Sequence, residues 1–105
     1  MANFVTAENF DAEVLKSELP VVVDFYAEWC GPCQKLTPVF DELSKELANK
    51  FKLVKVNIDE QRDLAINYNV SSIPTILFIK NGEVKGKETG YMSKEDLKAK
   101  INELL

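Results

Sequence analysis

The pentapeptide Trp29-Cys30-Gly31-Pro32-Cys33 contains both cysteines of this 105-residue chain. Two cysteines separated by two residues can close a small disulfide ring or be reduced to a dithiol, provided that the backbone between them has a suitable shape. The motif directly follows the apolar run Val21 to Tyr26 and directly precedes a long helical pattern. Thiol–disulfide chemistry is therefore the first hypothesis for this protein.

A metal site is the main chemical alternative for a cysteine pair. Structural zinc takes about four ligands, whereas this chain offers two cysteines and no histidine. We therefore expect no metal site within one chain, which leaves only a metal shared between two chains. The structural alternative is a packed pair that never reacts, but a helix N-terminus is a position at which thiols become reactive.

The length of 105 residues predicts one domain spanning residues 1–105, and the hydrophobic pattern described below assigns it to the α/β class. The net charge of −4 argues against a nucleic-acid partner, which would need a basic surface to neutralise phosphates. Residues 1–10 lack the basic and apolar regions of a signal peptide, and no apolar stretch approaches the roughly 18 residues of a membrane span. We expect a cytoplasmic protein with no membrane partner, where thiols stay reduced and a cysteine pair is more often catalytic than structural.

The hydrophobic pattern predicts a mixed sheet of about five strands flanked by four helices. The central strand, Val21 to Tyr26, is apolar almost throughout, which indicates burial on both faces. The other predicted strands are Phe4-Val5, Lys52 to Ile58, Thr75 to Ile79 and Glu83 to Thr89, with a hairpin turn at Asn81-Gly82. The predicted helices are one capped by Thr6, one from Cys33 to about Ala48, one from Arg62 to Tyr68, and one capped by Ser93.

The two cysteines should differ in reactivity because of their places on the helix that follows the central strand. Unpaired N–H groups and the positive end of the helix dipole face the Cys30 sulfur and favour the thiolate, the nucleophilic form. Cys33 lies one turn further in and should be more buried. We therefore expect Cys30 to attack a substrate disulfide and Cys33 to resolve the mixed disulfide. Between them, Gly31 adds no side chain and Pro32 no charge that would stabilise the reduced form, which favours a reductant.

Asp24 and Lys55 are isolated charges within predicted inner strands. A buried, unpaired carboxylate costs several kcal/mol unless it takes up a proton or finds a partner. Asp24 is therefore interpreted as a buried acid with a raised pKa that exchanges protons with Cys33 through water. The alternatives are an Asp24 carboxylate that caps nearby backbone N–H groups and a Lys55 side chain that reaches out to the surface.

The whole chain resembles the thioredoxin family in its W-C-G-P-C motif and in a set of residues spread beyond it, namely Asp24, Pro38, Lys55, Ile73-Pro74-Thr75 and Gly90. The resemblance implies the thioredoxin fold and a general protein disulfide reductase acting in electron transport and cell redox homeostasis. It implies a redox-active Cys30–Cys33 disulfide with no bound cofactor, and a monomer recycled by an NADPH-dependent flavoprotein, thioredoxin reductase. Two departures are Gln34, where many thioredoxins have Lys or Arg, and Tyr26, which replaces a frequent Trp.

The resemblance also implies how substrates dock. Lys55 should lie beside Asp24 and modulate it, and Pro74 should be cis and lie against the Cys30 sulfur. The Ile73 backbone should then pair with an extended substrate in the manner of an added strand. The expected substrate-binding residues are Trp29, Ile58, Ile73, Pro74, Thr75, Gly90 and Tyr91. Composition leaves two rivals open: a binding module in which redox activity is incidental, and a redox-sensing adaptor with one client.

Overall fold

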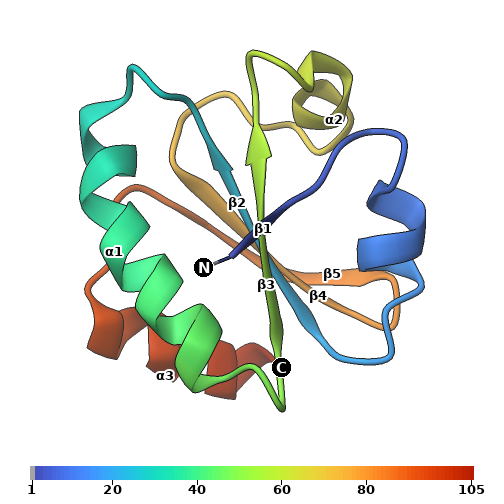
Figure 1. The fold of residues 1–105 in the computed structure, drawn as a ribbon, viewed down its shortest axis with the longest axis vertical. Coiled ribbons are helices and arrows are strands. Elements are labelled where there is room, and N and C mark those ends of the chain that lie inside the picture. Colours follow the sequence, from blue (N-terminus) through green and yellow to red (C-terminus); the bar gives the residue numbers. More distant parts are fainter. Residues whose placement is uncertain (1) are drawn as a thin grey trace.

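A five-stranded mixed sheet runs through the middle of the structure, a computed structural model that describes residues 2–105. The strand order is β1-β3-β2-β4-β5 (Figure 1). β1, β3 and β2 are parallel, whereas β4 is antiparallel to β2 and β5 is antiparallel to β4. The strands are β1 Asn3–Phe4, β2 Val21–Tyr26, β3 Lys52–Asn57, β4 Thr75–Lys80 and β5 Glu83–Thr89. The predicted mixed sheet and the place of its central strand are confirmed.

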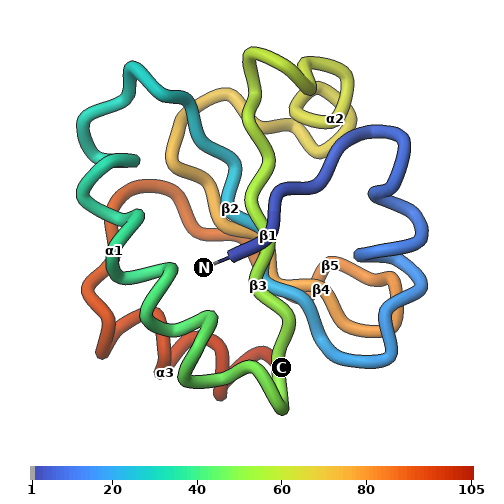
Figure 2. The backbone as a smooth tube through the Cα atoms, viewed as in Figure 1, coloured from blue at the N-terminus to red at the C-terminus, as the bar shows by residue number. Residues whose placement is uncertain are grey.

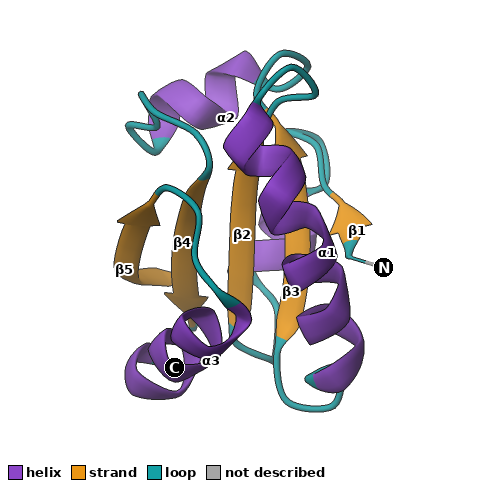
Figure 3. Ribbon diagram, turned by 90° about the vertical axis from the view of Figure 1, so that its left-hand side faces the viewer, coloured by secondary structure: helices purple, strands orange, loops and turns teal. Residues whose placement is uncertain are grey.

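Helices cover both faces of the sheet, which explains why β2 is apolar almost throughout. α1 (Gly31–Glu46) and α3 (Lys94–Leu104) lie on one face, and η1 (Asp11–Leu15) and α2 (Arg62–Asn67) lie on the other (Figures 1 and 3). Side chains alternate along a strand, so Val21, Val23 and Phe25 enter the cluster beneath η1 and α2. Val22 enters the cluster beneath α1 and α3. By the same alternation Asp24 lies on the α1 side.

α1 places the cysteine motif at the end of β2. The backbone passes from β2 into α1 and returns to β3, which gives two parallel neighbouring strands (Figure 2). Pro32 occupies the first turn, where a missing N–H group costs nothing. Leu36, Phe40 and Leu43 are buried at the predicted helical spacing, and the helix continues through Pro38.

The β4–β5 hairpin turns at Asn81-Gly82, as predicted. Both residues have positive φ angles, 53° and 77°, as a tight hairpin turn requires. α3 begins at the predicted cap, because the Ser93 hydroxyl accepts a hydrogen bond from the Asp96 N–H at 3.1 Å.

The prediction that Thr6 caps the first helix is wrong. η1 is a five-residue π-helix that follows Phe10 and has no side-chain cap. The Asn9 side chain instead accepts a hydrogen bond from the Thr6 N–H at 2.8 Å, and the Thr6 carbonyl accepts one from the Phe10 N–H. A cap would need the Thr6 hydroxyl oxygen to accept a backbone N–H, but this hydroxyl donates to Asn9 Oδ1 at 3.4 Å instead.

Candidate active site

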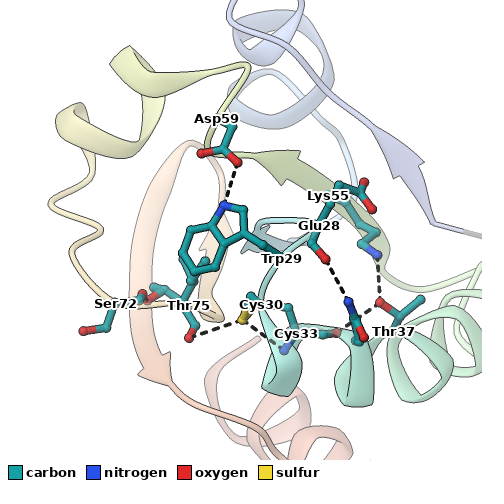
Figure 4. The surroundings of a disulfide bond; sticks show 11 residues. Glu28, Trp29, Cys30, Cys33, Thr37, Lys55, Asp59, Ser72 and Thr75 are labelled. Atoms are coloured by element: carbon teal, nitrogen blue, oxygen red, sulfur yellow. Dashed lines mark hydrogen bonds between the residues drawn. A yellow bond between two sulfur atoms is a disulfide. The ribbon is translucent and has the colours of Figure 1, made fainter.

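Cys30 and Cys33 form a disulfide at the N-terminus of α1 (Figure 4). Cys30 is the N-cap residue, and its Sγ accepts a hydrogen bond from the Cys33 N–H at 3.2 Å. One of the unpaired N–H groups of the first helical turn therefore points at this sulfur. The pair can thus store two electrons as a dithiol and release them on closing the disulfide.

The difference in burial between the two cysteines is smaller than the sequence argument suggested. Cys30 is 5% exposed and Cys33 is 2% exposed, so both are buried. Their surroundings differ more than their exposure does. The Cys30 Sγ lies 3.8 Å from the carbonyl oxygen of Ile73, at the Ile73–Pro74 peptide bond, which is cis as the resemblance implied. Cys33, unlike Cys30, is one of the residues that line a cavity next to α1.

Trp29, the first residue of the motif, is exposed on the surface. Its side chain is 69% exposed, and its indole N–H donates a hydrogen bond to Asp59 Oδ2 at 2.8 Å. Figure 4 shows the ring held over the motif by this contact. Asp59 was not among the predicted site residues. Its position just after β3 was the available signal, because the carboxyl ends of parallel neighbouring strands meet at one edge of the sheet.

Asp24 is a fully buried carboxyl with no hydrogen-bond partner for either oxygen among the described residues. Burial raises the pKa of Asp24 to about 7, against the opposing effect of the Lys55 charge and with a smaller upward contribution from Asp41. The alternative that Asp24 caps backbone N–H groups is contradicted by the missing partners. The predicted buried acid with a raised pKa is what the structure contains.

Lys55 is buried beside Asp24 and does not reach the surface. The two residues are paired across β2 and β3, and Lys55 is 5% exposed. Its ammonium donates a hydrogen bond to Thr37 Oγ1 at 3.3 Å and lies 4.5 Å from the centre of the Tyr26 ring. Thr37 was missed by the sequence analysis, although its position four residues after Cys33 places it on the same face of α1.

A cavity of about 200 Å³ lies next to Lys55 and Thr37, and Asp24 is not among its lining residues. Its lining includes Cys33, Thr37 and Lys55 together with Asp41 and Glu28. The space is large enough for water and has several polar partners for it, so a proton can travel between solvent and this buried region.

Two of the predicted substrate-binding residues lie against the cysteines. Ile58 and Ile73 are half-buried and pack against the cluster that holds both cysteines. The Gly90 N–H donates a hydrogen bond to the Pro74 carbonyl at 2.8 Å, and Tyr91 is exposed next to it. Thr75 is buried, and its hydroxyl donates to the Ser72 carbonyl.

Gln34, at the position where the resemblance expects Lys or Arg, forms a side-chain hydrogen bond to the backbone. Its side-chain amide donates a hydrogen bond to the Glu28 carbonyl at 2.8 Å, which ties α1 to the segment before the motif (Figure 4). Gly31 and Pro32 are exposed between the cysteines, so a partner can approach the disulfide from this side. Within residues 2–105 there is no cluster of three or more potential metal ligands, and no helix there is both long and apolar enough to cross a membrane.

Comparison with known proteins gives one family. The family model "Thioredoxin" matches residues 2–103. The chain is 54% identical over 102 residues to a thioredoxin of Rickettsia felis and 53% identical over 102 residues to one of Rickettsia conorii, with 97% of each chain covered in both cases. It is also 46% identical over 101 residues to a chloroplastic M-type thioredoxin of Pisum sativum, covering 96% of this chain and 59% of that one.

Proposed function

We propose, on the premise that this chain belongs to the thioredoxin family and is a protein disulfide reductase, that Cys30 is its attacking thiolate and Cys33 its resolving thiol. The hydrogen bond from the Cys33 N–H to the Cys30 sulfur carries this proposal. A partial positive charge at the start of α1 faces Cys30 and stabilises negative charge on its sulfur. Cys33 has no such position.

The exchange then has two balanced steps. The Cys30 thiolate attacks one sulfur of a client disulfide, the client S–S bond breaks, and a client thiolate leaves. Cys33 loses its proton and attacks the Cys30 sulfur, which expels the second client thiolate. Two electrons pass to the client, and the reductase ends as the Cys30–Cys33 disulfide that the structure contains.

Asp24 is proposed as the group that accepts the Cys33 proton in the second step. Its raised pKa of about 7 lets it change protonation state near neutral pH. The cavity supports this role, because it is lined by Cys33 and by Lys55, the strand partner of Asp24, and has room for water that carries the Cys33 proton towards Asp24. Lys55 modulates Asp24 through its nearby positive charge.

Clients are proposed to dock over Cys30 as extended segments. The Ile73 carbonyl points at the Cys30 sulfur from 3.8 Å, so a client strand that pairs with the Ile73 backbone would bring its disulfide to that sulfur. Apolar side chains of the client would contact a surface formed by Trp29, Ile58, Ile73, Pro74, Thr75, Gly90 and Tyr91.

The family implies clients with accessible disulfides and a reductase that returns the protein to the dithiol state. We propose that this reductase is an NADPH-dependent flavoprotein and that the protein acts as a cytoplasmic monomer.

The matched variants Cys30→Ser and Cys33→Ser test the assignment, because each removes one thiol from the same turn. We expect Cys30→Ser to abolish insulin reduction in a turbidity assay with a dithiol donor. Cys33→Ser should accumulate a covalent adduct with insulin, visible by mass spectrometry under non-reducing conditions, because the resolving thiol is missing. An adduct formed by Cys30→Ser and not by Cys33→Ser would reverse the two roles, and insulin reduction that survives Cys30→Ser would exclude the mechanism.

A further inference from the structure

The buried ammonium of Lys55 has two possible partners nearby, the Asp24 carboxyl and the Thr37 hydroxyl. It lies beside the unpartnered Asp24 carboxyl, yet no carboxylate of residues 2–105 forms a salt bridge with it. Its contacts are the Thr37 hydroxyl at 3.3 Å and the face of the Tyr26 ring at 4.5 Å. A carboxylate would attract the ammonium by its full negative charge, which a neutral hydroxyl lacks, so something must hold Lys55 in this arrangement.

The Thr37 hydroxyl has a fixed orientation that suits it to this task. It donates its own proton to the Cys33 carbonyl at 3.1 Å, and its oxygen accepts the hydrogen bond from Lys55 (Figure 4). A single hydroxyl thus links the ammonium to the helix that carries Cys33. A valine at this position has the same branched shape but can neither donate nor accept, so it would remove both hydrogen bonds.

We propose that Thr37 is a positioning residue, whose hydroxyl holds the Lys55 ammonium out of an ion pair with Asp24 and so keeps the Asp24 carboxyl available as the proton acceptor for Cys33. The inference rests on the proposed role of Asp24. The proton leaves the Cys33 sulfur and binds an Asp24 oxygen, the Cys33 electron pair forms the bond to the Cys30 sulfur, and the bond from Cys30 to the client breaks with the client thiolate as leaving group. An ion pair with Lys55 would make Asp24 a weaker base at that moment.

Other charged and titratable groups lie near Asp24 and Lys55, and the variants used to test the proposal leave all of them unchanged. Lys55 comes from β3, Asp41 and Cys33 come from α1, and Tyr26 and Glu28 come from the end of β2 and the segment after it. The neighbour of Asp24 on β4 is Ile76, which carries no charge. In the oxidised protein the bonded Cys33 does not titrate, so Asp24 can be followed without it.

The test is a pH titration of the Asp24 carboxyl carbon by NMR in the oxidised protein, with the signal assigned through its loss in Asp24→Asn. In Thr37→Val, the freed ammonium should pair with Asp24 and lower the titration midpoint by about one pH unit or more. Thr37→Ser keeps the hydroxyl and should restore the original midpoint. Ser44→Ala is the matched control, because Ser44 also donates its hydroxyl to a carbonyl within α1 but contacts no ammonium. An unchanged or raised midpoint in Thr37→Val would overturn the proposal.

A kinetic measurement separates this inference from the function on which it rests. The rate of mixed-disulfide resolution, followed by acid quench and mass spectrometry across pH, should reach its midpoint at a lower pH in Thr37→Val than in the unmodified protein. If the Asp24 midpoint moves and the resolution profile does not, Thr37 holds Lys55 but Asp24 does not accept the Cys33 proton. If both stay in place, Thr37 has no positioning role.

Discussion

Replacing Asp24 with asparagine should stabilise the oxidised protein at neutral and alkaline pH but not at acid pH. Asp24 is fully buried without a hydrogen-bond partner, and burial raises its pKa from 3.8 to about 7. Between these values the native state keeps a proton that the unfolded chain has released. The unfolded state therefore binds fewer protons, and stability falls as pH rises through this window. An asparagine has no charge to bury and lacks this penalty.

The size of the stability difference follows from the difference between the pKa values of Asp24 in the unfolded and native states. A shift from 3.8 to about 7, at about 1.36 kcal/mol per pKa unit, corresponds to about 4 kcal/mol. The free energy of unfolding of Asp24→Asn, relative to the unmodified protein, should therefore change little below pH 4. It should rise by about 1.4 kcal/mol per pH unit between pH 4 and pH 7 and stay constant above that range.

Urea unfolding followed by far-UV circular dichroism, from pH 4 to pH 9, measures this difference. The oxidised protein is the right material, because the bonded cysteines do not titrate. Glu8→Gln is a suitable control, since it removes an exposed carboxylate that makes no hydrogen bond or salt bridge among the described residues. A stability gain in Asp24→Asn that is the same at every pH would refute a proton-linked cause and leave only a packing effect.

Two further predictions follow from other ionisable groups and from the kinetics of Asp24. Asp24→Asn should slow the resolution step more than the first attack, and equal slowing of both steps in stopped-flow kinetics would contradict its role in accepting the Cys33 proton. Glu46→Gln should lower the melting temperature at low salt and neutral pH, because Glu46 on α1 bonds Lys94 and Lys98 on α3 at 2.8 Å. These hydrogen bonds lower the pKa of Glu46 to about 2, so the difference should fade as pH falls below 4 towards 2, and a difference that persists in 1 M salt would refute an electrostatic cause.

Most of the fold could be predicted from local sequence patterns. The predicted and observed bounds of the central strand agree at both ends, because its apolar run stops where the chain leaves the sheet. The Asn81-Gly82 turn and the Ser93 cap were also predictable, since each depends on residues within four positions of one another. The cap assigned to Thr6 failed because the Thr6 hydroxyl donates to the side chain of Asn9 and does not accept a backbone N–H.

The site could be predicted only where one residue type was itself unusual. A cysteine pair and a carboxylate within an apolar strand are conspicuous, whereas Thr37 and Asp59 are ordinary residues for a helix and a loop. Their roles depend on the distances to Lys55 and Trp29, which lie 18 and 30 positions away in the chain. Such contacts arise from the packing of α1 on the sheet and from the meeting of strand ends, and no local pattern records them.

The register between β2 and β3 determines whether this site can move a proton at all. Asp24 and Lys55 are partners in that register, and both face α1, where Cys33 and Thr37 lie. A slip of one residue in either strand would reverse which face its side chains occupy and send one of the two charges under η1 and α2. The apolar neighbours Val23 and Val54 prevent the slip, because they would have to leave the cluster on that face. The hydrophobic residues that stabilise the sheet thus also hold the acid, the ammonium and the resolving cysteine in one layer.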